Sequence, residues 1–116
     1  LKHGINGYKI QDISGLLENI VFLELCYRGY TVKIGKLGEK EIDFIAFKKN
    51  KKKYIQVAYL LLENKTIERE FSPLEKTGDN YPKFVLSLDK HFAGERNGIQ
   101  WQNLIDFLVS PEKEIS

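Results

Sequence analysis

The stretch from Lys53 to Leu62 combines strong β-forming residues with almost no alternation between apolar and polar positions. A strand with one face in water alternates, whereas a strand covered on both faces does not. We therefore predict a central strand lying between two layers of helices. The 116 residues suit one domain, so we expect residues 1–116 to form a single α/β unit with a mixed central sheet flanked by helices.

The rest of the chain supplies elements for such a layered fold. The apolar residues between Gly15 and Tyr27 recur at helical spacing around most of the circumference, which indicates a well-buried helix. Ser14 is its expected N-cap and Gly29 its expected end. The other expected elements are strands 30–34, 41–47, 83–88 and 98–101, a helix over 66–77 that Pro73 kinks or divides, a polar loop over 89–97, and a closing helix over 103–109. Residues 1–13 are expected to be irregular. The main order is α-β-β-β-α-β.

Composition excludes several classes of site. Cys26 is the only cysteine, so neither an intramolecular disulfide nor a cysteine-based zinc site can form. No stretch is long enough to span a membrane and no signal peptide is visible, so we expect a cytoplasmic protein without a membrane partner. The chain has no methionine, and we interpret it as a fragment of a longer protein.

Lysines crowd into the turn that is expected between the second and third strands. Five of the six residues from 48 to 53 are lysine, and Asn50 is the exception. The net charge of the whole chain is only +2, so any nucleic-acid surface depends on this kind of local clustering. The cluster can contact phosphate groups, or it can be an ordinary solvated turn.

Three oxygen-bearing side chains occupy unusual positions in these elements. Glu18 lies in the apolar helix, Asp43 interrupts an apolar strand, and Gln56 lies on the strand that follows. Burying a carboxylate is costly unless it is paired or binds a cation. Magnesium prefers oxygen ligands and keeps several waters. The three side chains therefore suggest a Mg²⁺ site that could activate water for attack on a phosphodiester.

Each of the three residues also has an ordinary structural interpretation. Glu18 can interact favourably with the helix dipole near the start of the helix, and Asp43 can pair with a local lysine. Gln56 can form hydrogen bonds to buried backbone groups. Strand alternation places Asp43 on the face of Ile45 and Phe47, and Gln56 on the face of Ala58. His3 and His91 fall in expected loops, where a surface role is the simpler interpretation.

Several segments in order resemble the C-terminal domain of predicted bacterial and archaeal AAA-type ATPases, a domain similar to the PD-(D/E)XK nuclease fold. The segments are residues 18–25, 28–32, 35–36, 41–46, 54–59, 69–71 and 79–87. The resemblance covers nearly all of the chain. It implies a restriction-endonuclease-like fold and an upstream P-loop ATPase domain. The chain itself has no P-loop motif, so any ATP binding belongs to the parent protein.

The resemblance also assigns roles to single residues. Glu18 matches the helical acid, Asp43 the first strand acid, Gln56 the second strand acid, and Ala58 the catalytic lysine. Because alanine cannot orient water or stabilise charge, the centre looks degenerate. A migrated cation would have to come from Lys36, Lys40 or Arg69, which are also the expected nucleic-acid contacts.

The function that we expect from the sequence is a nuclease-like C-terminal module that no longer cuts. It would bind DNA or a protein partner and act with the upstream ATPase domain. The alternatives are an active Mg²⁺-dependent DNA nuclease and a pure dimerisation or interaction domain. Mg²⁺ is the one cofactor that the pattern suggests, and the first of these functions does not require it.

Overall fold

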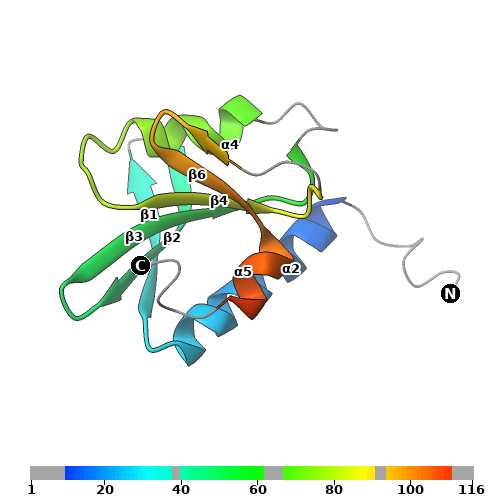
Figure 1. Cartoon of the computed structure of the whole chain (residues 1–116), viewed down its shortest axis with the longest axis horizontal. Coiled ribbons are helices and arrows are strands. Elements are labelled where there is room, and N and C mark those ends of the chain that lie inside the picture. The colour runs from blue at the N-terminus through cyan, green and yellow to red at the C-terminus, as the bar shows by residue number, and fades with distance from the viewer. Residues whose placement is uncertain (1–9, 38–39, 62–66, 91–93, 111–116) are drawn as a thin grey trace, which may run out of the picture.

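The computed structural model describes residues 10–37, 40–61, 67–90 and 94–110. The described chain forms helices and strands in the order α2, β1, β2, β3, α4, β4, β5, β6 and α5 (Figure 1). Their bounds are α2 Ile10–Tyr27, β1 Thr31–Leu37, β2 Lys40–Lys48, β3 Lys51–Val57, α4 Ile67–Glu75, β4 Lys83–Ser87, β5 Gly94–Arg96, β6 Ile99–Asn103 and α5 Leu104–Val109.

The strands form one mixed sheet of six strands in the order β1-β2-β3-β4-β6-β5. The pairs β1/β2, β2/β3 and β5/β6 are antiparallel. The pairs β3/β4 and β4/β6 are parallel. The antiparallel pair β2/β3 closes through a two-residue turn, whereas β3 reaches the parallel β4 only after α4 has crossed the sheet.

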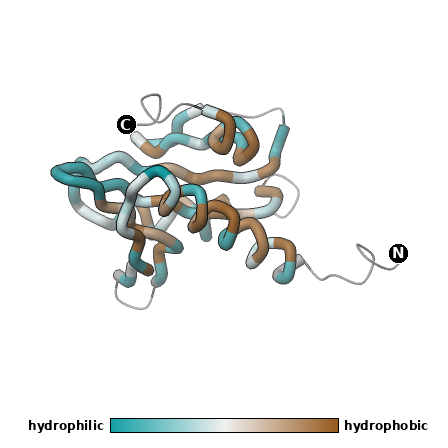
Figure 2. Tube along the Cα trace, turned by 90° about the horizontal axis from the view of Figure 1, so that it is seen from below, coloured by the Kyte–Doolittle hydropathy of each residue, from teal (hydrophilic) through white to brown (hydrophobic). Residues whose placement is uncertain are grey.

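Helices cover both faces of this sheet. Figure 1 places α2 and α5 on one face and α4 on the other. β3 contributes side chains to the two resulting cores: Ile55 and Val57 pack with α2 and α5, and Tyr54 packs with α4, as does Ala58 directly after the strand. Figure 2 shows the apolar residues concentrated along α2 and the central strands. The predicted α/β architecture, with a central strand covered on both faces, is confirmed. None of the described helices is long and apolar enough to cross a lipid bilayer.

Four expectations about the elements were wrong. Ser14 is not an N-cap, because α2 begins at Ile10 and Ser14 lies inside it; Ile13 packs against the core, and this contact favours the earlier start. The strand expected over 53–62 ends earlier, since β3 stops at Val57. Of the two effects expected of Pro73, a division of the helix does not occur, because α4 continues two residues beyond this buried proline. The polar loop over 89–97 contains strand β5, since Asn97 and Gly98 form a tight turn with positive φ at both positions. The irregular start was expected over residues 1–13, of which residues 1–9 lie outside the described residues.

A β-bulge in β2 lies at Asp43. Lys33 of β1 pairs with Ile45, but Gly35, only two residues on, pairs with Ile42. β2 therefore carries one extra residue, and strict alternation fails there. Ile42 and Ile45 consequently pack into the same core beside α4, although they are three residues apart. The expectation that simple alternation places Asp43 on the face of Ile45 and Phe47 does not hold across this bulge.

Candidate functional site

The candidate site begins where β2 and β3 separate. The pairing of the two strands extends from Lys48↔Lys51 to Phe44↔Ile55 and ends there. Figure 1 shows β2 turning away from β3 beyond that point. Beyond this point, hydrogen bonds that involve side chains connect β2 to β3 in place of backbone pairing. The Asp43 N–H donates to Gln56 Oε1 at 2.7 Å, and the Val57 N–H donates to Asp43 Oδ2 at 2.8 Å. The two predicted site residues are thus in direct contact.

The Gln56 amide uses both of its ends to hold backbone groups. Its oxygen accepts from Asp43, and its Nε2 donates to the Glu70 carbonyl oxygen at 3.2 Å. The side chain is only 3% exposed. A glutamate here would place a second oxygen against the Glu70 carbonyl and lose that hydrogen bond. The geometry therefore gives Gln56 a clear structural task, which is to tie β2 and α4 to β3.

Four carboxylates interact around Asp43, and we call them the acidic cluster: Glu18, Glu41, Asp43 and Glu70. They come from α2, from β2 and from α4, so the separation of β2 from β3 brings together acids from both faces of the sheet. Glu18, Asp43 and Glu70 are partly buried, whereas Glu41 is exposed. The predicted partners Glu18 and Asp43 belong to one electrostatic group.

The pKa values of this cluster are displaced upward. Burial, assisted by the charges of Glu18 and Glu41, raises the pKa of Asp43 to about 6, although the hydrogen bond from Val57 acts in the opposite direction. Burial, followed by the charge of Asp43, raises the pKa of Glu70 to about 7, although Arg69 acts in the opposite direction. Burial and then the charge of Glu41 also raise the pKa of Glu18. Burial is therefore the main cause of the raised pKa values, and repulsion between the carboxylates adds to it.

The cations that the sequence suggested lie around the cluster at different positions. Arg69 is exposed on α4 and close enough to Glu70 to lower its pKa. Lys36 is exposed on β1 and is the cross-strand partner of Glu41. The Lys40 side chain, His3 and His91 lie outside the described residues. Ala58 is buried beside α4 and has no charge to offer. Tyr59 packs against the opposite core, as strand alternation predicts.

The acidic cluster does not form a ready-made metal chelate. Across residues 10–37, 40–61, 67–90 and 94–110, no three His, Cys, Asp or Glu side chains converge as ligands of one ion. One oxygen of Asp43 is already engaged by Val57. The predicted set of Glu18, Asp43 and Gln56 therefore does not fit a catalytic Mg²⁺ ion in the geometry shown, because Gln56 is committed to the backbone.

Sequence reasoning did not select Glu70 or Glu41 as site residues. A signal for Glu70 was present: Ile67, Glu70, Phe71 and Leu74 follow the spacing of one helix face. Phe71 and Leu74 of that face are fully buried. A glutamate on this apolar helix face is unusual for the same reason that Glu18 is unusual in its apolar helix. Glu41 lies two residues before Asp43, but the bulge that begins at Asp43 prevents a simple alternation argument.

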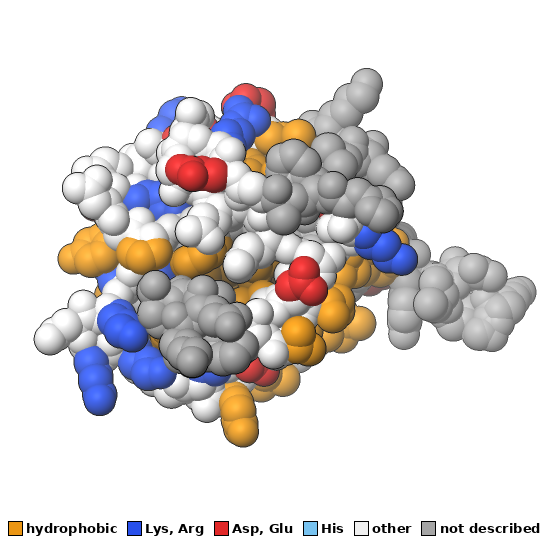
Figure 3. Space-filling model, in the orientation of Figure 1, with side chains coloured by type: hydrophobic (Ala, Val, Ile, Leu, Met, Phe, Trp, Pro, Cys, Tyr) orange, Lys and Arg blue, Asp and Glu red, His pale blue; other side chains and the backbone are white. Residues whose placement is uncertain are grey.

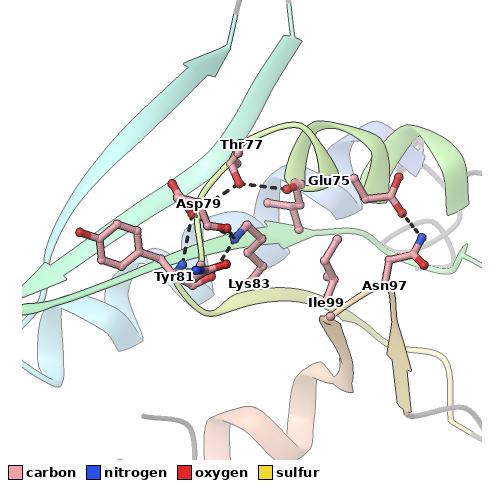
Figure 4. A pocket seen from close by; sticks show the side chains of 11 residues that line it. Glu75, Thr77, Asp79, Tyr81, Lys83, Asn97 and Ile99 are labelled. Carbon is pink, nitrogen blue, oxygen red and sulfur yellow. Dashed lines mark hydrogen bonds and ion pairs between the residues drawn. The ribbon is translucent and has the colours of Figure 1, made fainter.

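A separate polar hollow of about 260 Å³ lies between the loop after α4 and the β5–β6 turn. Figure 4 shows that its polar side chains bond to one another. Lys83 donates to Asp79 at 3.1 Å, and Asn97 donates to Glu75 at 2.8 Å. These interactions tie the loop and the turn to α4 and β4, and the acidic cluster does not line this hollow.

One relative was found among known proteins. A Haemophilus influenzae protein described as an uncharacterized protein is 41% identical over 108 residues. The match covers 93% of this chain but only 26% of the relative, so the chain spans about a quarter of that protein's length. No family model matches the chain. No solved structure matches it either.

Proposed function

We propose that this chain is a nuclease-like module that binds DNA without cutting it. In this proposal the mixed sheet is the restriction-endonuclease-like PD-(D/E)XK sheet, and the module is the C-terminal domain of a cytoplasmic AAA-type ATPase. The ATPase domain would lie outside these 116 residues. The matched Haemophilus protein is long enough to include such a domain, since the match covers only 26% of it.

The observation that carries the proposal is the side-chain exchange between Asp43 and Gln56 where β2 leaves β3. An acid on one strand faces the amide at the place of the second acid, across a sheet that opens at this point. The helical acid Glu18 interacts with the same group. The proposal is supported by this contact between residues of separate elements.

The same contacts argue against catalysis. The amide of Gln56 holds the backbone of β2 and α4, and buried Ala58 replaces the lysine. Catalysis of phosphodiester hydrolysis needs stabilisation of the charge that develops on the transferring group. The charged groups that act on Asp43 are Glu18 and Glu41, and both add negative charge instead. A metal ion bound at such a centre would act as a Lewis acid and would activate water. In the described part of the chain, however, no three Asp, Glu, His or Cys side chains converge to bind one.

The active nuclease remains the second candidate because of Arg69. Its charge lowers the pKa of Glu70, so it lies within electrostatic reach of the acidic cluster. A cation on α4 could replace the missing lysine. In this candidate, Glu18, Asp43 and Glu70 would have to move together and bind a metal ion when DNA binds.

The deciding experiment incubates the purified chain with single-stranded, duplex and branched DNA in Mg²⁺ or Mn²⁺, beside the variants Asp43→Ala and Arg69→Ala. We expect a shift of DNA mobility without cleavage products. Cleavage that chelator, Asp43→Ala and Arg69→Ala all abolish would establish the second candidate. Absence of both binding and cleavage, with a defined oligomer in light scattering, would instead support a dimerisation or docking domain.

A further inference from the structure

The end of the sheet opposite to the acidic cluster is strongly basic. β2 runs from Lys40 to Lys48, with Asp43 near its beginning. The five residue steps from Asp43 to Lys48 correspond to about 17 Å along a strand. Lys49 and Asn50 form the turn, and lysines continue at the start of β3. Figure 3 shows Lys and Arg side chains gathered at the lower left, where this turn lies in Figure 1.

A shallow groove of about 200 Å³ lies beside this turn, and we call it the hairpin groove. It is lined by Asn50, Lys51, Lys52, Lys53, Tyr81 and Pro82. The last two residues come from the loop between α4 and β4, which therefore forms the second wall. Figure 2 shows that this end of the molecule is its hydrophilic end. Lysine stems with an aromatic ring and a proline give the groove an apolar floor and a charged rim.

The Tyr81 ring is held in place but remains accessible. It is 45% exposed, and in Figure 4 it points away from the Asp79–Lys83 pair. The Tyr81 N–H donates to Asp79 Oδ1 at 3.2 Å, which fixes the loop beneath the ring. The Lys52 ammonium lies 4.8 Å from the centroid of the Tyr81 ring. An exposed ring with a cation over it is a surface on which a flat, electron-rich group can stack.

The carboxylate that holds the Tyr81 loop, Asp79, does not cancel the charge of the lysines. The Asp79 side chain accepts from the Tyr54 hydroxyl at 2.6 Å and from Lys83 at 3.1 Å. Its charge is therefore offset by Lys83, which does not line the groove. Lys49 and Lys51 are exposed at the rim. The groove thus presents an excess of positive charge next to an aromatic ring.

We infer that the hairpin groove binds single-stranded nucleic acid, with a base stacked on Tyr81 and the adjoining phosphates on Lys49, Lys51 and Lys52. The inference rests on the proposed DNA-binding function and names the surface that performs it. A duplex would satisfy the lysines, but its bases are stacked inside and cannot reach the ring. An acidic peptide would also satisfy the lysines, but it offers the ring no flat partner. The combination favours an unpaired strand.

The test measures fluorescence anisotropy of a labelled oligothymidylate roughly ten nucleotides long over a series of salt concentrations. The variant Tyr81→Ala removes the ring, and Tyr27→Ala on α2 is its control, since Tyr27 is 87% exposed and does not line the groove. We expect Tyr81→Ala to weaken binding about tenfold with little change in salt dependence. The control should bind like wild type.

The lysine arm of the test compares Lys51→Gln with Lys90→Gln. Lys90 is also exposed but follows β4 at the other end of the sheet. Loss of one phosphate contact should reduce the slope of log affinity against log salt by about 0.7, and only Lys51→Gln should show this reduction. Circular dichroism checks that all four variants fold, which their exposed positions favour.

Three results would overturn the inference. If wild type binds DNA but Tyr81→Ala and Lys51→Gln bind equally well, the groove is not the site, while the proposed function stands. If polyglutamate displaces the labelled strand as well as unlabelled strand does, the groove is a site for acidic proteins. If wild type binds no DNA of any form, the proposed function itself is wrong and the inference falls with it.

Discussion

At the scale of single residues, the raised pKa values of Asp43 and Glu70 predict that the protein is less stable at high pH. A carboxyl group whose pKa is higher in the folded state stabilises the fold while protonated, and the effect is lost as pH rises through the folded pKa. The window runs from ordinary values of 3.8 and 4.5 to about 6 for Asp43 and about 7 for Glu70. We expect Asp43→Asn and Glu70→Gln each to raise the free energy of unfolding at pH 8 by roughly 1–2 kcal/mol.

The measurement is urea unfolding at pH 4 and at pH 8, and Asp79→Asn is the control with the opposite sign. Although burial raises the pKa of Asp79, the hydrogen bonds from Tyr54, Lys83 and the Tyr81 N–H together hold it below its ordinary value. That variant should lose stability at pH 8 and match wild type at low pH. A gain from Asp43→Asn that persists unchanged at pH 4 would rule out the burial of a charged carboxylate as its cause.

Individual residues also mark the limit of what the sequence could predict. Glu18, Asp43 and Gln56 are recognisable because polar residues in apolar stretches are costly, and the structure brings the three together. The structural role of Gln56 was not predictable, since it depends on a hydrogen bond to the Glu70 carbonyl oxygen of α4, which lies in another part of the sequence. The sequence showed which side chains carry oxygen atoms, but it could not show that Gln56 Oε1 and Asp43 Oδ2 accept hydrogen bonds from the backbone.

At the scale of elements, the close packing of β1 against the bulge of β2 depends on Gly35. A Cβ atom at this position would lie 2.7 Å from Ile45 Cδ1 and 3.2 Å from Ile42 Cβ. We expect Gly35→Ala to destabilise the fold by about 1–3 kcal/mol in urea unfolding, as overpacked cores do. Gly15→Ala is the matched control, because Gly15 lies in α2 with no atom within 4 Å of the added methyl group. It should stabilise the helix by roughly 0.5–1 kcal/mol. Equal effects of the two variants would contradict the packing argument.

The elements themselves were predictable where a long pattern specifies them. β2, β4 and α5 were expected to within one residue of their observed bounds, because hydrophobic periodicity extends over whole elements. α2 begins five residues earlier than expected, and β3 ends five residues earlier than expected. The bulge was not expected, because one extra residue leaves no mark in a short apolar strand. The β5–β6 hairpin was missed although Asn97-Gly98 is a strong turn signal, since its first strand has only three residues.

At the scale of the whole molecule, the two cores share the same strands and should unfold together. Ile55, Val57, Phe84 and Leu86 face α2 and α5, whereas Tyr54 and Val85 of the same two strands face α4. Neither core can open without breaking β3 or β4. We therefore expect one cooperative transition, in which Trp101 fluorescence and far-UV circular dichroism give the same midpoint in urea.

The variant Leu25→Ala tests whether the two cores unfold in one cooperative transition. Leu25 is fully buried in the core beside α2, whereas Trp101 packs in the other core against Phe71. Removing the leucine side chain should lower the free energy of unfolding by about 2–5 kcal/mol. Because the strands are shared, the Trp101 transition should move by the same amount as the circular dichroism, although the cavity lies on the opposite face. A Trp101 midpoint that stays in place while the dichroism shifts would mean that the two faces of the sheet unfold as separate units.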